Sequence, residues 1–293
     1  RDMTEFIELQ AGVAVDEIGG EITVRAGDTK DVAYYLDGVP IPSTDHVRTR
    51  VYRNFNRLAV QEMTVVTGGM NAEYGNAQGG IVNVVTREGR EGYHGLADYQ
   101  FTPPGKKHWG ANVYESPMHQ GKVKWDDPAW VAETVTLPDG RVVPAQRRRD
   151  YTGVSGHVVE GMLSGPLTQD LSFLASSRWQ RQPSAFPGSY PATPSNLNAL
   201  AKLTARPGQG LKVNVGGFYD RRKGAFDPVA LQGIARGGLT AREAFRRSLG
   251  VPTAGQGLFL VDPRPAGEFV DTDHLFYIGL THMLSGKTFY EVR

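Results

Sequence analysis

The feature that most constrains this chain is an alternation of apolar and polar residues with a period of two in its last two hundred positions. Between residues 196 and 206 every second residue is apolar, and those between are polar except for Leu200. Successive side chains of a β-strand point to opposite faces, so each such segment is expected to be a strand with one apolar and one polar face. We predict about seven of these strands: 92–101, 151–164, 171–180, 196–206, 211–220, 271–284 and 288–293.

The connections between these strands are of two kinds. Short turns are expected at 165–170, 207–210 and 285–287, whereas the connections over 103–149, 181–195 and 221–269 are long. Alternating strands with short turns at one end and long loops at the other are typical of a transmembrane β-barrel. A soluble β-sandwich alternates as well, although loops of this length are unusual in a compact soluble domain. The alternation alone leaves both architectures open.

Composition excludes several classes of function. The 32 Lys and Arg residues balance 31 Asp and Glu residues, so there is no electrostatic case for nucleic-acid binding. The absence of cysteine excludes disulfides, thiolate metal sites and a cysteine nucleophile. The seven histidines show no zinc-binding spacing, and no phosphate-binding loop or nucleophile elbow is present. We therefore expect no catalytic residue, no metal site and no cofactor.

The first ninety residues follow a different pattern. Short runs rich in β-branched and aromatic residues predict strands over 21–25, 32–36, 63–67 and 80–86, and Asp37-Gly38 predicts a tight turn. Asp37 is expected to cap the local backbone in that turn. We also predict a helix over 1–13 and a helical turn over 53–58. Together these elements indicate a small mixed α/β unit.

Two motifs in this region resemble the plug domain of TonB-dependent outer-membrane receptors. The segment Tyr35–Pro40 is similar to the family's Y-x-D-G-V-P motif, and Val65–Thr86 is similar to the glycine-rich end of the plug. The segments resemble the Oar-like receptors of Bacteroidetes-type bacteria more than the classical siderophore receptors. The plug motif positions are Arg25, Tyr35, Asp37, Gly38, Glu73, Tyr74, Gly75, Gly80 and Asn83.

The resemblance implies a mostly β fold, in which a small mixed α/β plug domain sits inside an antiparallel transmembrane β-barrel. Residues 1–90 would be the plug, and residues 91–293 the N-terminal part of a barrel of about 22 strands. It further implies an outer-membrane receptor of a Gram-negative bacterium that binds a ligand outside the cell and imports it with TonB-transmitted energy. A non-transporting scaffold, adhesion or export barrel of the Oar-like type is the alternative.

Several partners follow from the same resemblance. The barrel would contact outer-membrane lipid and lipopolysaccharide, and the TonB complex would bind through an N-terminal segment that lies outside these residues. A surface lipoprotein or other outer-membrane subunits could also assemble with it, and no nucleic-acid partner is expected. Arg25 aligns with the arginine of the plug's Arg-Gly motif, which pairs with barrel-wall glutamates in relatives.

Three features of the long loops are candidate sites. Aromatic residues crowd the first loop and either stack on ligand or form loop core: Trp109, Tyr114, Trp125 and Trp130. Two basic triplets, Arg147-Arg148-Arg149 and Arg221-Arg222-Lys223, would lie at the extracellular rim, where they either bind lipopolysaccharide phosphate or remain solvated. A capping box at Thr240–Glu243 predicts a helix over 241–249 in the third long loop.

Overall fold

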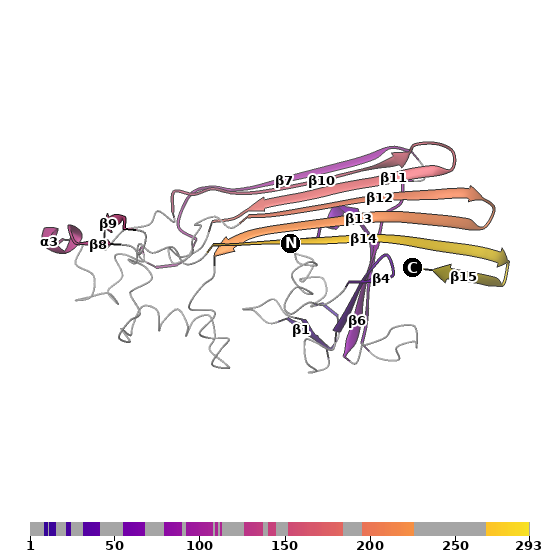
Figure 1. The fold of residues 1–293 in the computed structure, drawn as a ribbon, viewed down its shortest axis with the longest axis horizontal. Coiled ribbons are helices and arrows are strands. Elements are labelled where there is room, and N and C mark those ends of the chain that lie inside the picture. The colour runs from indigo at the N-terminus through magenta and orange to yellow at the C-terminus, as the bar shows by residue number, and fades with distance from the viewer. Residues whose placement is uncertain are drawn as a thin grey trace.

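The computed structural model consists mainly of strands, arranged as one large sheet and a smaller unit against one of its faces (Figure 1). It describes residues 9–10, 12–15, 22–24, 32–41, 55–67, 79–89, 92–107, 109–110, 112, 126–136, 140–144, 152–183, 195–225 and 268–292. Among these residues, no helix is both long and apolar enough to cross a membrane.

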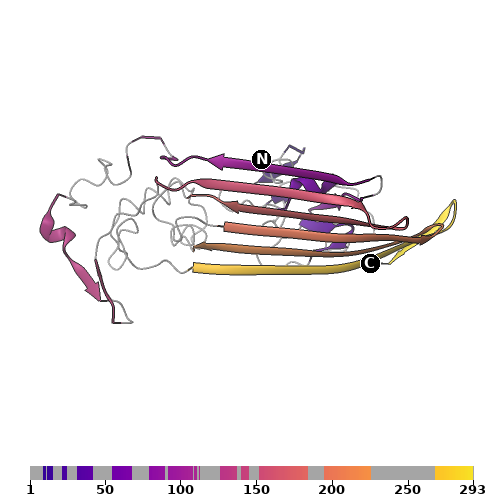
Figure 2. The same ribbon diagram turned by 90° about the horizontal axis from the view of Figure 1, so that it is seen from above.

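The large sheet, here called the wall, is antiparallel and has seven strands in the order β15-β14-β13-β12-β11-β10-β7. Its strands are β7 (His94–Thr102), β10 (Gly156–Pro166), β11 (Leu171–Arg181), β12 (Ser195–Gly208), β13 (Leu211–Ala225), β14 (Glu268–Ser285) and β15 (Thr288–Val292). Each one overlaps a predicted strand, and neighbours in sequence are neighbours in space. Figure 2 shows the strands running side by side along the long axis of the molecule. The predicted antiparallel β architecture is confirmed.

The turns also follow the prediction. Short connections at 167–170, 209–210 and 286–287 join strands at one end of the wall. The first long connection, between β7 and β10, carries the short elements α3 (Pro128–Val131), β8 (Thr134–Thr136) and β9 (Val142–Pro144). The predicted helix over 241–249 lies outside the described residues.

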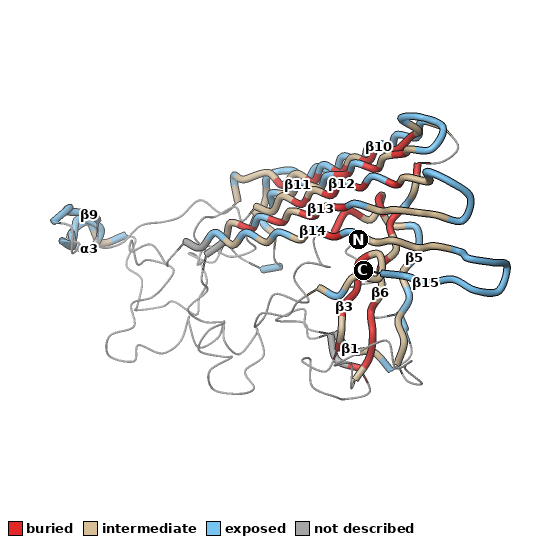
Figure 3. The backbone as a smooth tube through the Cα atoms, turned by 45° about the vertical axis from the view of Figure 1, so that its right-hand side comes forward, coloured by how far each residue is buried: buried red, intermediate tan, exposed pale blue. Residues whose placement is uncertain are grey.

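The two faces of the wall have opposite chemistry. Its outer face exposes apolar side chains to the surroundings: Val159, Leu163, Trp179, Leu203, Val215 and Ile278. Its inner face, which the smaller unit covers, buries polar ones: Glu160, Ser164, Ser176, Asn198, Lys202 and Asp220. Figure 3 shows this as an alternation of buried and more exposed positions along the strands. Apolar side chains outside and polar ones inside are the arrangement of a transmembrane barrel.

The smaller unit, here called the plug, contains a four-stranded sheet in the order β4-β3-β6-β5. Strand β3 (Val32–Leu36) lies parallel to β6 (Gly80–Thr86), and β4 (Val39–Pro40) and β5 (Val60–Val66) are the antiparallel edges. A second pair consists of β1 (Val13–Val15) and β2 (Ile22–Val24). The one described helical turn before β5 is the 3-10 helix η2 (Arg57–Ala59).

Two local predictions in the plug are resolved differently. The Asp37-Gly38 turn is confirmed, because both residues have positive φ, 49° and 77°, and the turn joins β3 directly to β4. The helix predicted over 1–13 is wrong at its end, since Val13 begins β1 and pairs with Val24. Residues 1–8 lie outside the described residues.

The plug and the wall share one apolar core. Leu36, Phe55 and Val84 of the plug pack in the same cluster as Leu200, Phe218 and Met162 of the wall. The rings of Phe55 and Phe218 stack with centroids 5.7 Å apart. Leu200 breaks the alternation of β12 because it faces the plug, where it is 2% exposed. The exception in the sequence pattern therefore marks the place where the plug docks.

Replacing Phe218 by Ala is expected to loosen the plug on the wall. Truncation of a buried Phe leaves a cavity and costs about 3 kcal/mol or more. The hydrogen-exchange protection of the β6 amides, measured on the full-length receptor in detergent, should fall accordingly. Val215→Ala is the matched control, because Val215 lies three positions away on the outer face. Equal losses in the two variants would contradict a shared core.

Candidate functional site

The plug turn at Asp37 is tied to the end of the neighbouring strand β6. The backbone N–H of Asp37 donates to the carbonyl oxygen of Val84 over 2.8 Å. In return, the carboxylate of Asp37 accepts hydrogen bonds from Thr86, from its N–H at 2.8 Å and from its Oγ1 at 2.7 Å. The prediction that Asp37 caps only its own turn is therefore incomplete, because its partner lies 49 positions later.

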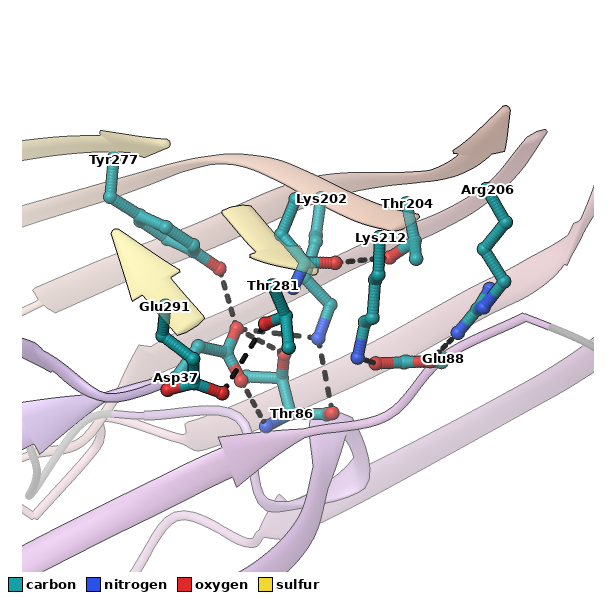
Figure 4. A network of polar contacts seen from close by, with 11 residues as sticks. Asp37, Thr86, Glu88, Lys202, Thr204, Arg206, Lys212, Tyr277, Thr281 and Glu291 are labelled. Atoms are coloured by element: carbon teal, nitrogen blue, oxygen red, sulfur yellow. Dashed lines mark hydrogen bonds and ion pairs between the residues drawn. The ribbon is translucent and has the colours of Figure 1, made fainter. Parts of the chain in front are cut away.

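Two residues of the wall reach the same carboxylate (Figure 4). The hydroxyl of Tyr277 on β14 donates to Asp37 Oδ2 over 2.5 Å, and Lys202 Nζ on β12 lies 3.3 Å from the same oxygen. Lys202 Nζ also donates to the carbonyl oxygen of Thr86 over 3.1 Å. We call Asp37, Thr86, Lys202 and Tyr277 the Asp37 cluster. It joins plug and wall through a charge-assisted contact, which is stronger than a neutral one.

A glycine makes this contact possible. Gly216 lies opposite Lys202 on one side and opposite Tyr277 on the other, so the three residues share one row across β12, β13 and β14. A Cβ atom at Gly216 would overlap the ring and hydroxyl of Tyr277. The ring therefore leans across β13, over the space that a side chain at Gly216 would fill, to reach Asp37.

A second contact fixes the chain where it leaves the plug. Glu88 follows β6 and forms ion pairs with Arg206 of β12 and Lys212 of β13. Partial burial disfavours the ionised form of Glu88, but the hydrogen bonds from Lys212 and Arg206 and the charges of Lys212 and Lys202 outweigh that effect. The pKa of Glu88 is consequently held below its ordinary value of 4.5. This contact lies near the short turn between β12 and β13.

A third contact lies further along the wall, at η2. Arg57 Nε donates to Glu160 Oε2 over 3.0 Å, and Arg178 Nε donates to the other oxygen of Glu160 over 2.7 Å. Arg57 Nη2 also donates to Asp98 over 3.1 Å. The hydrogen bond to Glu160 is the main reason that the pKa of Arg57 is raised. Glu160 is 3% exposed, so these two arginines neutralise a buried charge.

The residue before Arg57 adds neutral hydrogen bonds. The fully buried Asn56 donates from Nδ2 to the carbonyl oxygens of Gly161 on β10 and Ser177 on β11, over 2.7 and 3.0 Å. Its Oδ1 accepts from the N–H of Leu58 and so caps η2. One side chain thus holds the start of η2 and fixes it to two wall strands.

The predicted basic triplet 221–223 does not form one cluster. It lies within β13 rather than after it, so its side chains alternate between faces. Arg221 is exposed on the outer face, whereas Arg222 is buried on the inner face. Arg222 forms ion pairs with Asp220 at 3.2 Å, Asp273 at 3.3 Å and Asp271 at 3.6 Å. The guanidinium of Arg222 therefore lies on the inner face and pairs with these carboxylates. The prediction that Arg222 binds lipopolysaccharide at the outer rim is wrong.

The remaining predicted site residues are distributed as follows. Tyr35 is buried in β3, Asn83 lies in β6, and Gly80 packs so closely on Val24 that a Cβ would touch it at 3.0 Å. Trp109 is fully exposed. Trp130 lies on α3, and Lys223 is half-buried. The positions outside the described residues are Arg25, Glu73, Tyr74, Gly75, Tyr114, Trp125, Arg147, Arg148 and Arg149.

Sequence reasoning missed the wall residues that hold the plug. Lys202 and Tyr277 are 165 and 240 positions from Asp37, and nothing local links them. One signal in the sequence could have indicated Lys202. It is a charged residue on the polar face of an alternating strand, and such a residue needs a partner if that face is buried. Across the described ranges, no three His, Asp or Glu side chains are close enough together to hold a metal ion.

Comparison with known proteins identifies the architecture. Residues 1–81 match the family described as "TonB-dependent Receptor Plug Domain". The N-terminal part of the chain therefore resembles the plug domain of TonB-dependent receptors. The chain is 30% identical over 106 residues to the TonB-dependent transporter Oar of Myxococcus xanthus, an alignment that covers 35% of this chain and 9% of that protein. It is also 30% identical over 129 residues to the ferrienterobactin receptor of Escherichia coli K12, covering 38% of this chain and 17% of that protein.

Solved receptors share the fold at lower identity. The ferric citrate transporter FecA in its unliganded form superposes with a TM-score of 0.62 at 14% identity, covering 99% of this chain and 36% of FecA. The siderophore receptor PirA of Acinetobacter baumannii gives a TM-score of 0.59 at 14% identity, covering 96% of this chain and 35% of PirA. The chain thus spans about a third of the length of these receptors.

The TonB-dependent receptors that this chain resembles are proteins of the Gram-negative outer membrane. The two curated relatives come from Myxococcus xanthus and Escherichia coli. They give no support to the Bacteroidetes-type source that the sequence motifs indicated.

The contact at Glu88 predicts a pH dependence. Because its pKa is lower in the folded protein than its ordinary value of 4.5, ionised Glu88 favours the folded state above that pH. This stabilisation is lost as the pH falls through the lowered pKa. Glu88→Gln should therefore be less resistant to denaturant than the wild type at pH 7, and the difference should shrink in acid. A difference that stays constant with pH would contradict an ionic contact.

Removal of the charge at Glu160 should be more damaging. Glu160→Gln leaves Arg57 and Arg178 without their shared carboxylate, and breaking a buried ion pair costs about 3–5 kcal/mol. The midpoint of denaturant unfolding of the full-length receptor should fall. Glu62→Gln is the matched control, since Glu62 is exposed on β5. Equal midpoints for both variants would show that the Glu160 contacts contribute nothing.

Proposed function

We propose that this protein is a receptor that binds a ligand at the extracellular face and imports it through a plug-gated barrel with energy transmitted by TonB. The observation that carries the proposal is the plug itself, which packs on the polar inner face of the wall. A barrel filled in this way does not conduct solutes until the plug rearranges, so transport needs an energy input. The match of residues 1–81 to the plug domain of TonB-dependent receptors supports the same source of energy.

The proposed domain division places the plug at residues 1–90 and the N-terminal portion of the barrel at 91–293. The family match over residues 1–81 and the start of the first wall strand at His94 support it. The long connections 103–149, 181–195 and 221–269 would be extracellular, because short turns face the periplasm in barrels of this kind.

The ligand is proposed to bind between these loops and the plug. Trp109 and Trp130, with Tyr114 and Trp125 of the same loop, are the aromatic candidates for stacking on it. The names of two relatives mention ferric enterobactin and ferric citrate, so a ferric chelate is the first ligand to test. The work of the protein would be binding and movement, with no covalent step and no cofactor.

The proposed partners are the TonB complex on the periplasmic side and the lipid and lipopolysaccharide of the outer membrane. Arg221 and Lys223 remain candidates for phosphate contacts at the outer rim, with Arg147, Arg148 and Arg149 as a second group. Arg25 is proposed to pair with a barrel glutamate. A surface lipoprotein or other outer-membrane subunits are further proposed partners. The relative named as a transporter favours transport over a non-transporting scaffold.

Energised import gives a direct test. A strain lacking the full gene should lose uptake of its radiolabelled ferric chelate and regain it with the wild-type gene. A protonophore should abolish that uptake, because TonB draws on the proton-motive force, while passive uptake of a small solute through porins should be unchanged. Uptake that survives the protonophore would overturn the energised mechanism, and high-affinity binding without any uptake would support the scaffold.

A further inference from the structure

We propose that Lys202, Tyr277 and Gly216 form a carboxylate-binding site on the inner face of the wall, which the plug fills in this structure with Asp37. When the turn withdraws, a carboxylate of a solute in the lumen takes its place. The withdrawal step rests on the proposed transport function. The binding chemistry rests only on the contacts around Asp37.

The donors around Asp37 divide between two parts of the chain. Thr86 supplies two donors and moves with the plug, since β6 is hydrogen-bonded to β3. Tyr277 and Lys202 supply the other two and belong to the wall. Both wall donors converge on a single oxygen, Oδ2. The wall therefore offers the ammonium group of Lys202 and the hydroxyl of Tyr277, and both are placed to bind the same oxygen of a carboxylate.

The wall site depends on the plug for its acceptors. The side chain of Lys202 is only 2% exposed, and it bonds to Asp37 and to the carbonyl oxygen of Thr86, both on the plug. If the plug turn withdraws while β6 stays in place, the buried ammonium group loses the carboxylate and keeps only the carbonyl oxygen of Thr86. Leaving a buried charge unpaired is strongly unfavourable. A small anion that accepts hydrogen bonds from both Lys202 and Tyr277 would replace the lost carboxylate and neutralise the ammonium charge.

Gly216 gives the site its shape. It lies between Lys202 and Tyr277 in the row across three strands, and any side chain there would meet the Tyr277 ring. The absence of a side chain gives the Tyr277 ring room to lean across β13, so its hydroxyl reaches the same carboxylate oxygen as the Lys202 ammonium group (Figure 4). A planar carboxylate fits such a pair of donors, and Asp37 demonstrates the fit.

The test removes the resident carboxylate and offers a free one. Asp37 has φ 49°, so Asp37→Gly keeps the turn without backbone strain and empties the site. In the full-length receptor in detergent, hydrogen-exchange protection of β6 should fall about ten-fold in this variant, since a buried contact is lost. Sodium formate should restore the protection in a saturable manner, and sodium chloride at equal ionic strength should not.

Three matched variants separate a specific site from general salt effects. Asp37→Asn tolerates the same turn but fills the space, so formate should change nothing. Asp37→Gly combined with Lys202→Met should show no rescue. Asp37→Gly combined with Gly216→Ala should need more formate, because the Tyr277 hydroxyl is displaced. Equal rescue by formate and chloride, or rescue that survives Lys202→Met, would overturn the proposal.

If Asp37→Gly does not fold in chloride, the refolding yield provides the same test. More folded receptor in formate than in chloride supports the site, and equal yields contradict it. None of these measurements needs TonB or an energised membrane. Failure of formate rescue would therefore reject the carboxylate site while leaving energised import standing, and loss of import alone would leave the site standing.

Discussion

The polar inner face of the wall is the constraint on which the rest of the structure depends. A strand that turns apolar side chains outward must turn its alternate residues inward, and here those residues include charged groups such as Glu160, Lys202 and Asp220. Buried charges are costly unless they are paired. Some are paired within the wall, as Asp220 is with Arg222, and others are paired by the plug.

The plug is also stabilised by its contacts with the wall. Its four-stranded sheet has short strands, and its core is shared with residues of the wall such as Leu200 and Phe218. Separating the two would expose apolar surface on both sides, in addition to breaking the contacts at Asp37, Arg57 and Glu88. The plug is therefore held by many moderate contacts spread along the wall.

These contacts differ in how they respond to displacement. The apolar core loses its favourable energy with the area exposed, whereas a short charge-assisted contact such as Tyr277 to Asp37 is lost within a small movement. The row Lys202–Gly216–Tyr277 retains its geometry because it is part of a continuous ladder of strands. The positions of these three residues relative to one another are therefore set by the wall and not by the plug.

The sequence by itself determined the strands, their two faces and most of their turns. Each of these depends on residues close together in the chain: the period-two pattern of β12, the Asp-Gly turn at 37–38 and the short connection at 209–210. The same local pattern also marked Leu200 as an exception, without giving the reason. Even the plug motif was recognisable, because its glycines and its Tyr35–Pro40 segment are contiguous.

Only the tertiary structure decided which inward side chains meet. Arg222 looked like one member of a surface triplet until its position inside β13 turned it toward Asp220. Asp37 looked like a turn residue until the docking of the plug brought it to Lys202 and Tyr277. The physical reason is that a period-two pattern fixes the face of a side chain but not its partner. The partner depends on the register of strands and on how the plug docks, and both are set by contacts between residues far apart in the chain.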